Sequence, residues 1–322
     1  MVPENVRRPT LKVIITGASG FIGKNLVLKS PKTWEIFALY NQTSDFPQFI
    51  ESHRLNHITP IKCDLTSTVE IEKMVKQASK HFDACIYLAA NGDPALSVEK
   101  PLLDLKLTTD TVINFLSSVE VRRFIYFSSG AVYEGRSGFV SPEVGVNPVI
   151  AYAISHLASE QYIRFFMHRG NIGEYVILRF FGAYGPYEPE RKIYTKLVRA
   201  FCLEGKNEFT VRGDGENLID AMYIDDAIEG ILKVMESGKN NLTADFCSGA
   251  PLTVNALVKT AGALFQKQEV RLQHEGSVPE YNCFHASPET MDELFGFRPR
   301  VSLQEGLTKF AALLKEQKGK EI

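Results

Sequence analysis

The segment LKVIITGASGFIG, residues 11–23, decides the fold of this 322-residue chain. Its apolar run LKVIIT predicts a buried strand, and a helix is expected from about Phe21 to Lys29. Gly17, Gly20 and Gly23 lie between them with GxxGxxG spacing. Such glycines permit a tight turn, close approach of a pyrophosphate to the backbone, and packing of the helix on the sheet. The phosphate then meets free N–H groups at the start of the helix. A plain glycine turn is the structural alternative, but the context predicts dinucleotide binding. The predicted contacts in this loop are Gly17, Ser19, Gly20, Phe21, Ile22 and Gly23.

The composition is that of an ordinary globular protein, with 44% hydrophobic and 23% charged residues. The net charge of -2 gives no reason to expect nucleic acid or a membrane surface as a partner. No apolar run approaches the roughly 20 residues that span a bilayer, and no signal peptide is recognisable, so we expect a cytoplasmic protein. The five cysteines lack metal-ligand spacing, which favours reduced thiols and no metal site.

Short β-rich runs alternate with helical patterns along the first half of the chain. Strands are expected at 11–16, 35–40, 57–63, 84–90, 122–129 and 174–180, and helices near 21–29, 67–80, 101–118 and 149–169. Continuous apolar strands that alternate with helices predict an α/β fold, a doubly wound parallel sheet of the Rossmann type. Ligands are expected at the carboxyl ends of its strands.

The pattern loosens after residue 180. Helices are expected at 192–204, 224–237, 253–266, 287–295 and 302–316, with strands at 208–211 and 243–249. This predicts a smaller, discontinuous C-terminal α/β lobe for the substrate. We expect a dinucleotide-binding domain of residues 1–181 plus about 221–248, and a substrate lobe of about 182–220 plus 249–322.

The end of the second strand leaves the choice of cofactor open. An acidic residue there would hold the ribose of NAD and an arginine would favour NADP, but the run reads Leu39-Tyr40-Asn41-Gln42. Tyr40 and Asn41 are expected to contact the cofactor. After the third strand, Asp64 and Leu65 are placed to meet adenine, and Asp64 could also cap the next helix.

Together these motifs resemble the extended short-chain dehydrogenase/reductase family, the branch of nucleotide-sugar epimerases, dehydratases and reductases. TGASGFIG resembles its cofactor loop and YAISH (152–156) its YxxxK motif. The other resembling segments are YLAA (87–90), FSSGAVYEG (127–135), LRFFGAYGP (178–186), GDGENLIDAMYIDD (213–226) and LFGFRPRVSLQEGL (294–307). These matches are specific for the fold and less specific for the reaction.

The resemblance implies a site and its partners. Tyr152 would be the general acid/base, Ser129 would hydrogen-bond the substrate oxygen, and His156 stands where the family has lysine. The remaining cofactor contacts would be Leu88, Ala89, Ala90 and Phe180. It also implies NAD or NADP, with NAD favoured, a nucleotide-sugar substrate, and a homodimer through the helices at 101–118 and 149–169.

Several positions depart from the family pattern. A lysine ammonium would lower the pKa of the tyrosine, whereas a histidine with a pKa near 6.5 is mostly neutral at pH 7. The asparagine of the YGP segment is Gly182, and the arginine that grips the substrate pyrophosphate is Ile219. The basic residues that could substitute for it are Arg191, Lys192, Lys196, Arg212 and Arg298.

The reaction narrows to two enzymatic possibilities. Gly130 and Ala131 follow Ser129 where dehydratases of this family carry Asp-Glu, so an epimerase or a ketoreductase is expected. A dinucleotide-binding protein that has lost its chemistry is the alternative. His156, Gly182 and Ile219 favour that alternative, and the complete Ser129–Tyr152 pair argues against it.

Overall fold

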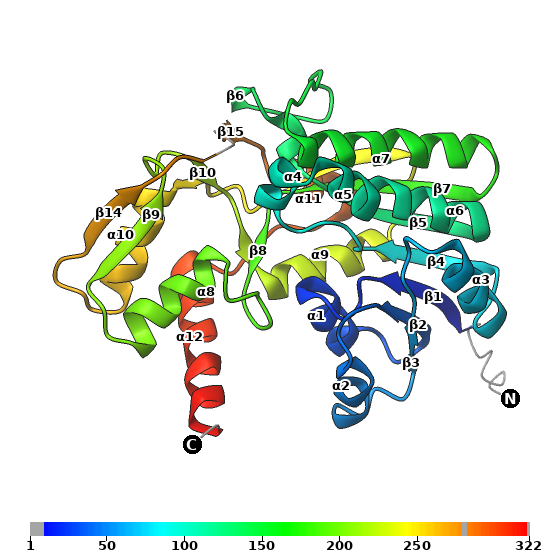
Figure 1. Ribbon diagram of the computed structural model, residues 1–322, viewed down its shortest axis with the longest axis horizontal. Coiled ribbons are helices and arrows are strands. Elements are labelled where there is room, and N and C mark those ends of the chain that lie inside the picture. Colours follow the sequence, from blue (N-terminus) through cyan, green and yellow to red (C-terminus); the bar gives the residue numbers. More distant parts are fainter. Residues whose placement is uncertain (1–9, 279–281, 321–322) are drawn as a thin grey trace, which may run out of the picture.

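The computed structural model describes residues 10–278 and 282–320, and a twisted parallel sheet lies at its centre (Figure 1). The sheet has seven strands in the order β12-β7-β5-β4-β1-β2-β3, with every neighbouring pair parallel. This confirms the predicted doubly wound sheet. In chain order its strands are β1 (Leu11–Thr16), β2 (Trp34–Tyr40), β3 (Ile58–Lys62), β4 (His81–Tyr87), β5 (Glu120–Ser129), β7 (Ile172–Phe180) and β12 (Leu242–Phe246).

Helices cover both faces of this sheet, because successive strand residues point to opposite sides. On β1, Val13 and Ile15 belong to one buried cluster and Ile14 to another. The first cluster includes apolar residues of α1 (Phe21–Lys29), α2 (Phe46–Ser52) and α9 (Ile224–Glu236). The second includes those of α3 (Thr68–Gln77), α6 (Thr111–Ser118) and α7 (Ala151–His168).

The expected helix at 101–118 is a chain of three helical segments. They are α5 (Pro101–Leu105), the π-helical η1 (Lys106–Asp110) and α6. Side chains around the π segment are buried against α7: the Thr109 hydroxyl donates to the Ser155 carbonyl, and the Ser155 hydroxyl donates to Asp104 at 2.6 Å. Tertiary hydrogen bonds therefore accompany the local change of helical pitch.

The remaining elements are those of the C-terminal lobe, at the left of Figure 1, and short segments that flank the sheet. Their helical segments are α4 (Pro94–Glu99), η2 (Gly130–Tyr133), α8 (Ile193–Val198), η3 (Arg199–Leu203), α10 (Val254–Leu264), α11 (Glu289–Phe295) and α12 (Leu303–Lys320). Their strands are β6 (Ser137–Phe139), β8 (Ala183–Tyr184), β9 (Glu208–Arg212), β10 (Leu218–Ile219), β11 (Met222–Tyr223), β13 (Leu252–Thr253), β14 (Arg271–Glu275) and β15 (Cys283–His285).

The C-terminal lobe is built from pairs of strands and the helices beside them. β9 pairs with β14, β10 with β13, and β11 with β8. β12, although late in the chain, joins the edge of the main sheet beside β7. This crossing supports the proposed division into a domain of 1–181 plus about 221–248 and a lobe of about 182–220 plus 249–322.

Some of the local structure differs from the expectation. β4 ends at Tyr87, so Leu88 to Ala90 form a loop and not the end of a strand. The helices α2 and α4 were not foreseen, since each is short and has proline in its first turn. Across the described parts of the chain, no helix combines the length and hydropathy needed to cross a membrane.

Candidate cofactor and active site

The glycine loop between β1 and α1 leaves room for a ligand and not for side chains. Gly17 has φ +66°, a conformation that L residues rarely adopt, and a Cβ added there would lie 3.0 Å from the backbone nitrogen of Ala89. A Cβ on Gly23 would lie 2.4 Å from the Gly17 carbonyl oxygen. The close approach of loop, helix and β4 therefore requires glycine at both positions. A backbone cradle of this kind fits the diphosphate of a dinucleotide.

One cavity of about 360 Å³ extends from this loop across the ends of β2 and β3. It is lined by many of the residues predicted to contact the cofactor. Those residues are Gly17, Ser19, Gly20, Tyr40, Asn41, Asp64, Leu65, Leu88, Ala89 and Ala90.

Asp64 is held as a carboxylate at the edge of this cavity. Partial burial opposes its ionisation, but hydrogen bonds from Thr66 and Asn41 outweigh burial and bring its pKa below the ordinary value. The expectation that Asp64 caps the next helix was wrong: the Ser67 hydroxyl is the cap of α3 and accepts from the Glu70 N–H. Asp64 instead accepts from the Thr66 N–H at 2.9 Å and keeps its charge beside the cavity.

A second cavity, of about 420 Å³, begins at the same loop and continues toward the C-terminal lobe. Tyr152 lines it, and so does Phe180 at the end of β7. The glycine-loop residues that line it are Gly17, Gly20, Phe21, Ile22 and Gly23, with Leu88 and Ala90 from the loop after β4. The structure thus brings the predicted proton-transfer residue and the predicted cofactor loop to one cavity.

His156 lies one turn of α7 below Tyr152 and is 3% exposed. The two rings meet edge to face with centroids 4.7 Å apart. Nδ1 of His156 lies 3.2 Å from the Tyr126 hydroxyl, whereas Nε2 is buried with no hydrogen-bond partner in the described structure. Burial lowers the pKa of His156 to about 4, so its ring is neutral at pH 7.

Neutral His156 differs from the lysine of the family pattern in place as well as charge. It lines neither of the two cavities, because its ring is packed behind Tyr152 against Tyr126. It therefore offers no positive charge to stabilise a phenolate. The predicted contact of His156 with the cofactor has no direct support from this geometry.

Ser129 ends β5 beside these cavities and does not line either of them. Its hydroxyl accepts from the Ala131 N–H at 3.1 Å and caps the short helix η2. Its neighbour Ser128 lines the cavity of Tyr152, and the next residue, Gly130, lines an adjoining space of about 150 Å³. Ser129 is thus at the junction of the two spaces, with its hydroxyl hydrogen still available to donate.

A buried ionic network fixes this end of the sheet. Arg179 donates to both carboxylate oxygens of Glu160, at 3.1 and 3.0 Å, and Ser128 donates to the same carboxylate at 2.7 Å. Arg179 also donates to the Tyr133 hydroxyl, which donates to Asp245 at 2.8 Å. Burial raises the pKa of Asp245 to about 7. The network joins β5, α7, β7 and β12, and so holds the elements that carry Ser129 and Tyr152.

Two departures from the family pattern, Gly182 and Ile219, lie in the cavity of Tyr152 and at the space beside Gly130, respectively. Gly182 has φ +129°, so an asparagine there would be strained. Ile219 lines the space of about 150 Å³ with Gly130 and Phe181. Its neighbour Asp220 is buried and accepts from the N–H groups of Ser248 and Gly249, which is a structural role.

Sequence reasoning missed several residues at the cavity of Tyr152. Glu188 is the clearest: burial raises its pKa to about 7, and its carboxylate accepts from the Thr195 N–H and hydroxyl at 2.8 and 2.7 Å. The polar run YEPERK (187–192) reads as a solvated loop, so no local signal indicates a buried carboxyl group there. For Ser128, the available signal was its position directly before Ser129 in the FSSG segment.

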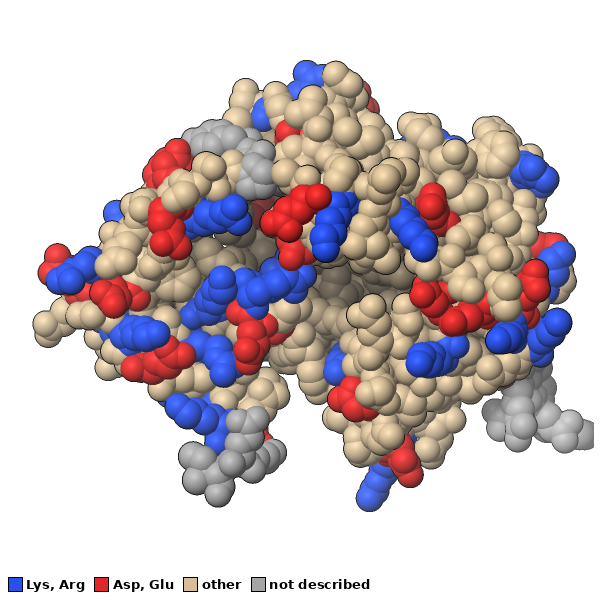
Figure 2. All heavy atoms as spheres, in the orientation of Figure 1, with Lys and Arg blue, Asp and Glu red and all other residues tan. Residues whose placement is uncertain are grey.

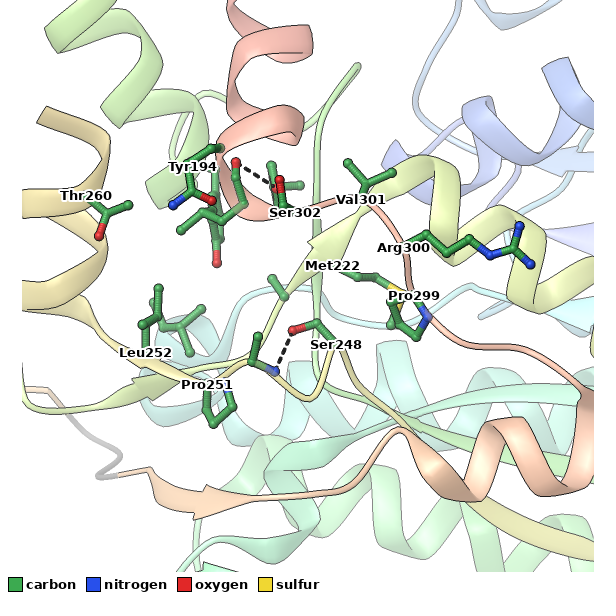
Figure 3. Close-up of a pocket in the computed structure, with 16 residues that line it drawn as sticks. Tyr194, Met222, Ser248, Pro251, Leu252, Thr260, Pro299, Arg300, Val301 and Ser302 are labelled. Atoms are coloured by element: carbon green, nitrogen blue, oxygen red, sulfur yellow. Dashed lines mark hydrogen bonds between the residues drawn. The ribbon is translucent and has the colours of Figure 1, made fainter. Parts of the chain in front are cut away.

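A further cavity, of about 500 Å³, lies within the C-terminal lobe (Figure 3). Tyr194, Leu252 and Thr260 line it, and the Arg300 guanidinium points away from them. None of the predicted catalytic or cofactor-binding residues lines this cavity, so we do not assign the chemistry to it.

The parallel sheet and the two cavities at the glycine loop are features of an α/β dinucleotide-binding enzyme, and Tyr152 lines one of these cavities. Residues 13–245 match the family described as the NAD dependent epimerase/dehydratase family. The chain belongs to this family. That membership confirms the resemblance noted in the sequence, and NAD as the expected cofactor.

Individual relatives cover the chain almost completely. A putative UDP-glucose 4-epimerase of Methanocaldococcus jannaschii is 23% identical over 94% of this chain and 98% of its own length. The UDP-glucose 4-epimerase of Thermotoga maritima, solved with UDP-glucose, has a TM-score of 0.84 at 23% identity, over 96% of this chain and all (100%) of that one. The UDP-glucuronic acid 4-epimerase of Bacillus cereus, solved with UDP-glucuronic acid and NAD, has a TM-score of 0.83 at 24% identity, over 95% and 100%.

Proposed function

We propose that this protein is an NAD-dependent nucleotide-sugar epimerase that inverts a hydroxyl-bearing carbon of the sugar. The observation that carries the proposal is that Tyr152 and the glycine loop line one cavity of about 420 Å³. The named relatives act on UDP-glucose or UDP-glucuronic acid at C4, which makes UDP-hexoses the first substrates to try.

In this mechanism the chain moves a proton and orients the sugar. NAD, held by the glycine loop, would supply the acceptor and then the donor of the hydride that leaves and rejoins the sugar carbon. Tyr152, as the phenolate, accepts the proton of the hydroxyl as the carbon is oxidised, and as the phenol it gives the proton back as the carbonyl is reduced. Ser129, at the end of β5, donates a hydrogen bond to the same oxygen and holds it near Tyr152. Rotation of the sugar between the two hydride transfers requires open space, which the adjoining cavity beside Gly130 supplies.

Replacing Tyr152 by phenylalanine tests the proposal directly. We expect Tyr152→Phe to lower turnover of UDP-glucose or UDP-glucuronic acid by at least about a hundredfold, because proton transfer contributes about 10²–10⁴ to such rates. NAD binding, measured by equilibrium dialysis, should change little. Tyr162→Phe is the matched control, since Tyr162 is an exposed tyrosine on the same helix. Unchanged turnover in Tyr152→Phe would exclude its role.

Two other functions make different predictions. Native mass spectrometry of the fresh protein should reveal retained NAD if it is an epimerase, whereas an empty protein that takes up NADPH would be a ketoreductase. A non-catalytic NAD-binding protein is favoured by one observation, the neutral and buried His156. In that case wild type would bind NAD and turn over none of the sugars.

A substitution at position 156 tests whether the charge of this residue affects proton transfer by Tyr152. A lysine at this position would bring a positive charge close to Tyr152 and stabilise its phenolate. We expect His156→Lys to shift the pH optimum of turnover to lower pH. An unmoved optimum would show that the charge at position 156 is not coupled to proton transfer.

A cytoplasmic location stays a prediction.

We also propose that the protein forms a homodimer through α5 and α7. Large apolar side chains on these neighbouring helices and on α4 are exposed, including Leu102 at 81% and Phe165 at 47%. Apolar surface of this kind is typical of interfaces between subunits. The double variant Leu102→Glu/Phe165→Glu should be a monomer by light scattering, and an unchanged mass would exclude this interface.

A further inference from the structure

The five basic residues that could replace the missing pyrophosphate arginine lie in different parts of the structure. Arg191 and Lys192 line the cavity that also contains Tyr152 and the glycine loop. Among the described residues along this cleft, which includes the adenosine cavity and the space beside Gly130, no other lysine or arginine lines the walls. The remaining three candidates, which make their contacts elsewhere, are Lys196, Arg212 and Arg298.

The loop that carries these two cations is anchored to the dinucleotide-binding domain. On α1, the Asn25 amide donates to the Pro186 carbonyl at 2.8 Å, and the Lys24 ammonium lies 5.6 Å from the ring centre of Tyr187. At the other end of the loop, Glu188 holds the start of α8 through Thr195. Residues 186–192 therefore run across the cleft with fixed ends, and Arg191 and Lys192 are presented to it on exposed side chains.

The present partners of the two cations are weak. Lys192 Nζ donates to the Gly92 carbonyl at 3.2 Å, and Arg191 Nε lies 3.3 Å from the Asp93 carboxylate. Both members of the Arg191–Asp93 pair are well exposed, 48% and 38%, and such pairs contribute little. The Glu188 carboxylate also attracts Lys192, but its hydrogen bonds come from Thr195. Figure 2 shows lysine and arginine side chains along the rim of the hollow in this face of the molecule.

We propose that Arg191 and Lys192 form a clamp that binds a diphosphate from the C-terminal side of the cleft, opposite the glycine loop. An arginine and a lysine match the two negative charges of a diphosphate, and the arginine can bind two oxygens at once. The diphosphate belongs either to the dinucleotide or to the nucleotide sugar, and both would lie in the cavity these residues line. The clamp rests on the proposed function only in that these are the expected ligands.

Equilibrium dialysis with labelled NAD and, separately, with labelled UDP tests the clamp without requiring turnover. We expect Arg191→Gln/Lys192→Gln to weaken binding of at least one of them by about a hundredfold, since a hydrogen bond to a charged group commonly changes affinity about tenfold or more. Binding of adenosine, which lacks phosphate, should be unchanged. The matched control is Lys196→Gln, which removes a nearby charge that lines a different cavity.

Each outcome has a defined meaning. Weakened NAD alone identifies the dinucleotide as the source of the diphosphate, weakened UDP alone identifies the nucleotide sugar, and either supports the clamp. The clamp would be overturned if Arg191→Gln/Lys192→Gln, with unchanged thermal unfolding, bound NAD and UDP with affinities within about twofold of those of the Lys196→Gln control. Failure of the proposed epimerase is distinguishable, because wild type would then bind both ligands in a clamp-dependent way and convert no sugar.

Discussion

Acidification should destabilise the folded protein through His156, and the size of the effect follows from its burial. The histidine is 3% exposed, and burial lowers its folded-state pKa to about 4, against 6.5 as the ordinary value. Between these two values the unfolded chain binds more protons than the folded one. The free energy of unfolding therefore falls as the pH falls from 6.5 toward 4, and this contribution is fully present above the unfolded value.

The linkage relation gives the magnitude. With these pKa values, protonation of His156 favours unfolding by about 2 kcal/mol more at about pH 4.5 than at about pH 7. Burial of Asp245 and Glu188 raises the pKa of each to about 7, which acts in the opposite direction over the same range. The effect of His156 is therefore measured as a difference in stability loss between wild type and a variant at position 156, because both proteins keep these two carboxyl groups.

Urea denaturation of wild type and His156→Gln at the two pH values provides that difference. Glutamine retains a hydrogen-bonding group for Tyr126 and does not titrate. On going from about pH 7 to about pH 4.5, wild type should lose about 2 kcal/mol more stability than the variant. The same loss in both, within about 0.5 kcal/mol, would mean that His156 is not held neutral by burial and would refute the reasoning.

Two further substitutions test the cofactor loop and the buried network. Gly23→Ala places a Cβ 2.4 Å from the Gly17 carbonyl oxygen, which must displace the glycine loop. We therefore expect the NAD affinity measured by equilibrium dialysis to fall at least about tenfold. An affinity equal to that of wild type would contradict the close packing. Glu160→Gln leaves the buried Arg179 without its charged partner and should lower the free energy of unfolding in urea by about 3–5 kcal/mol. Glu120→Gln, which removes an exposed partner of Lys80, should cost much less stability, and equal losses would show that burial does not strengthen the Glu160 contact.

The elements foreseen from the sequence are those specified by near neighbours along the chain. The strand at 11–16 and the helix at 21–29 have the predicted bounds, because an apolar run and three spaced glycines act locally. The long helix at 101–118 was foreseen as a continuous pattern, but not its π segment. That segment is accompanied by hydrogen bonds to Ser155 on α7, a partner that local periodicity does not reveal.

The same distinction applies to the candidate site. The sequence identified the glycine loop, Tyr152 and Ser129 by motif, and it marked position 156 as unusual. The sequence already implies a mostly neutral histidine at pH 7, and only the tertiary structure lowers its pKa to about 4, because the ring is buried behind Tyr152 and beside Tyr126 of β5.

The sequence by itself determined the sheet, the cofactor loop and the order of the motifs, because these depend on residue type and short-range spacing. It offered five equivalent basic residues for the missing arginine, and only the folded chain distinguished Arg191 and Lys192 among them. Whether a charge faces a ligand depends on which segments lie across the cleft. Here, those segments are residues 91–93 and 191–192, about a hundred positions apart in the chain and in contact only after folding.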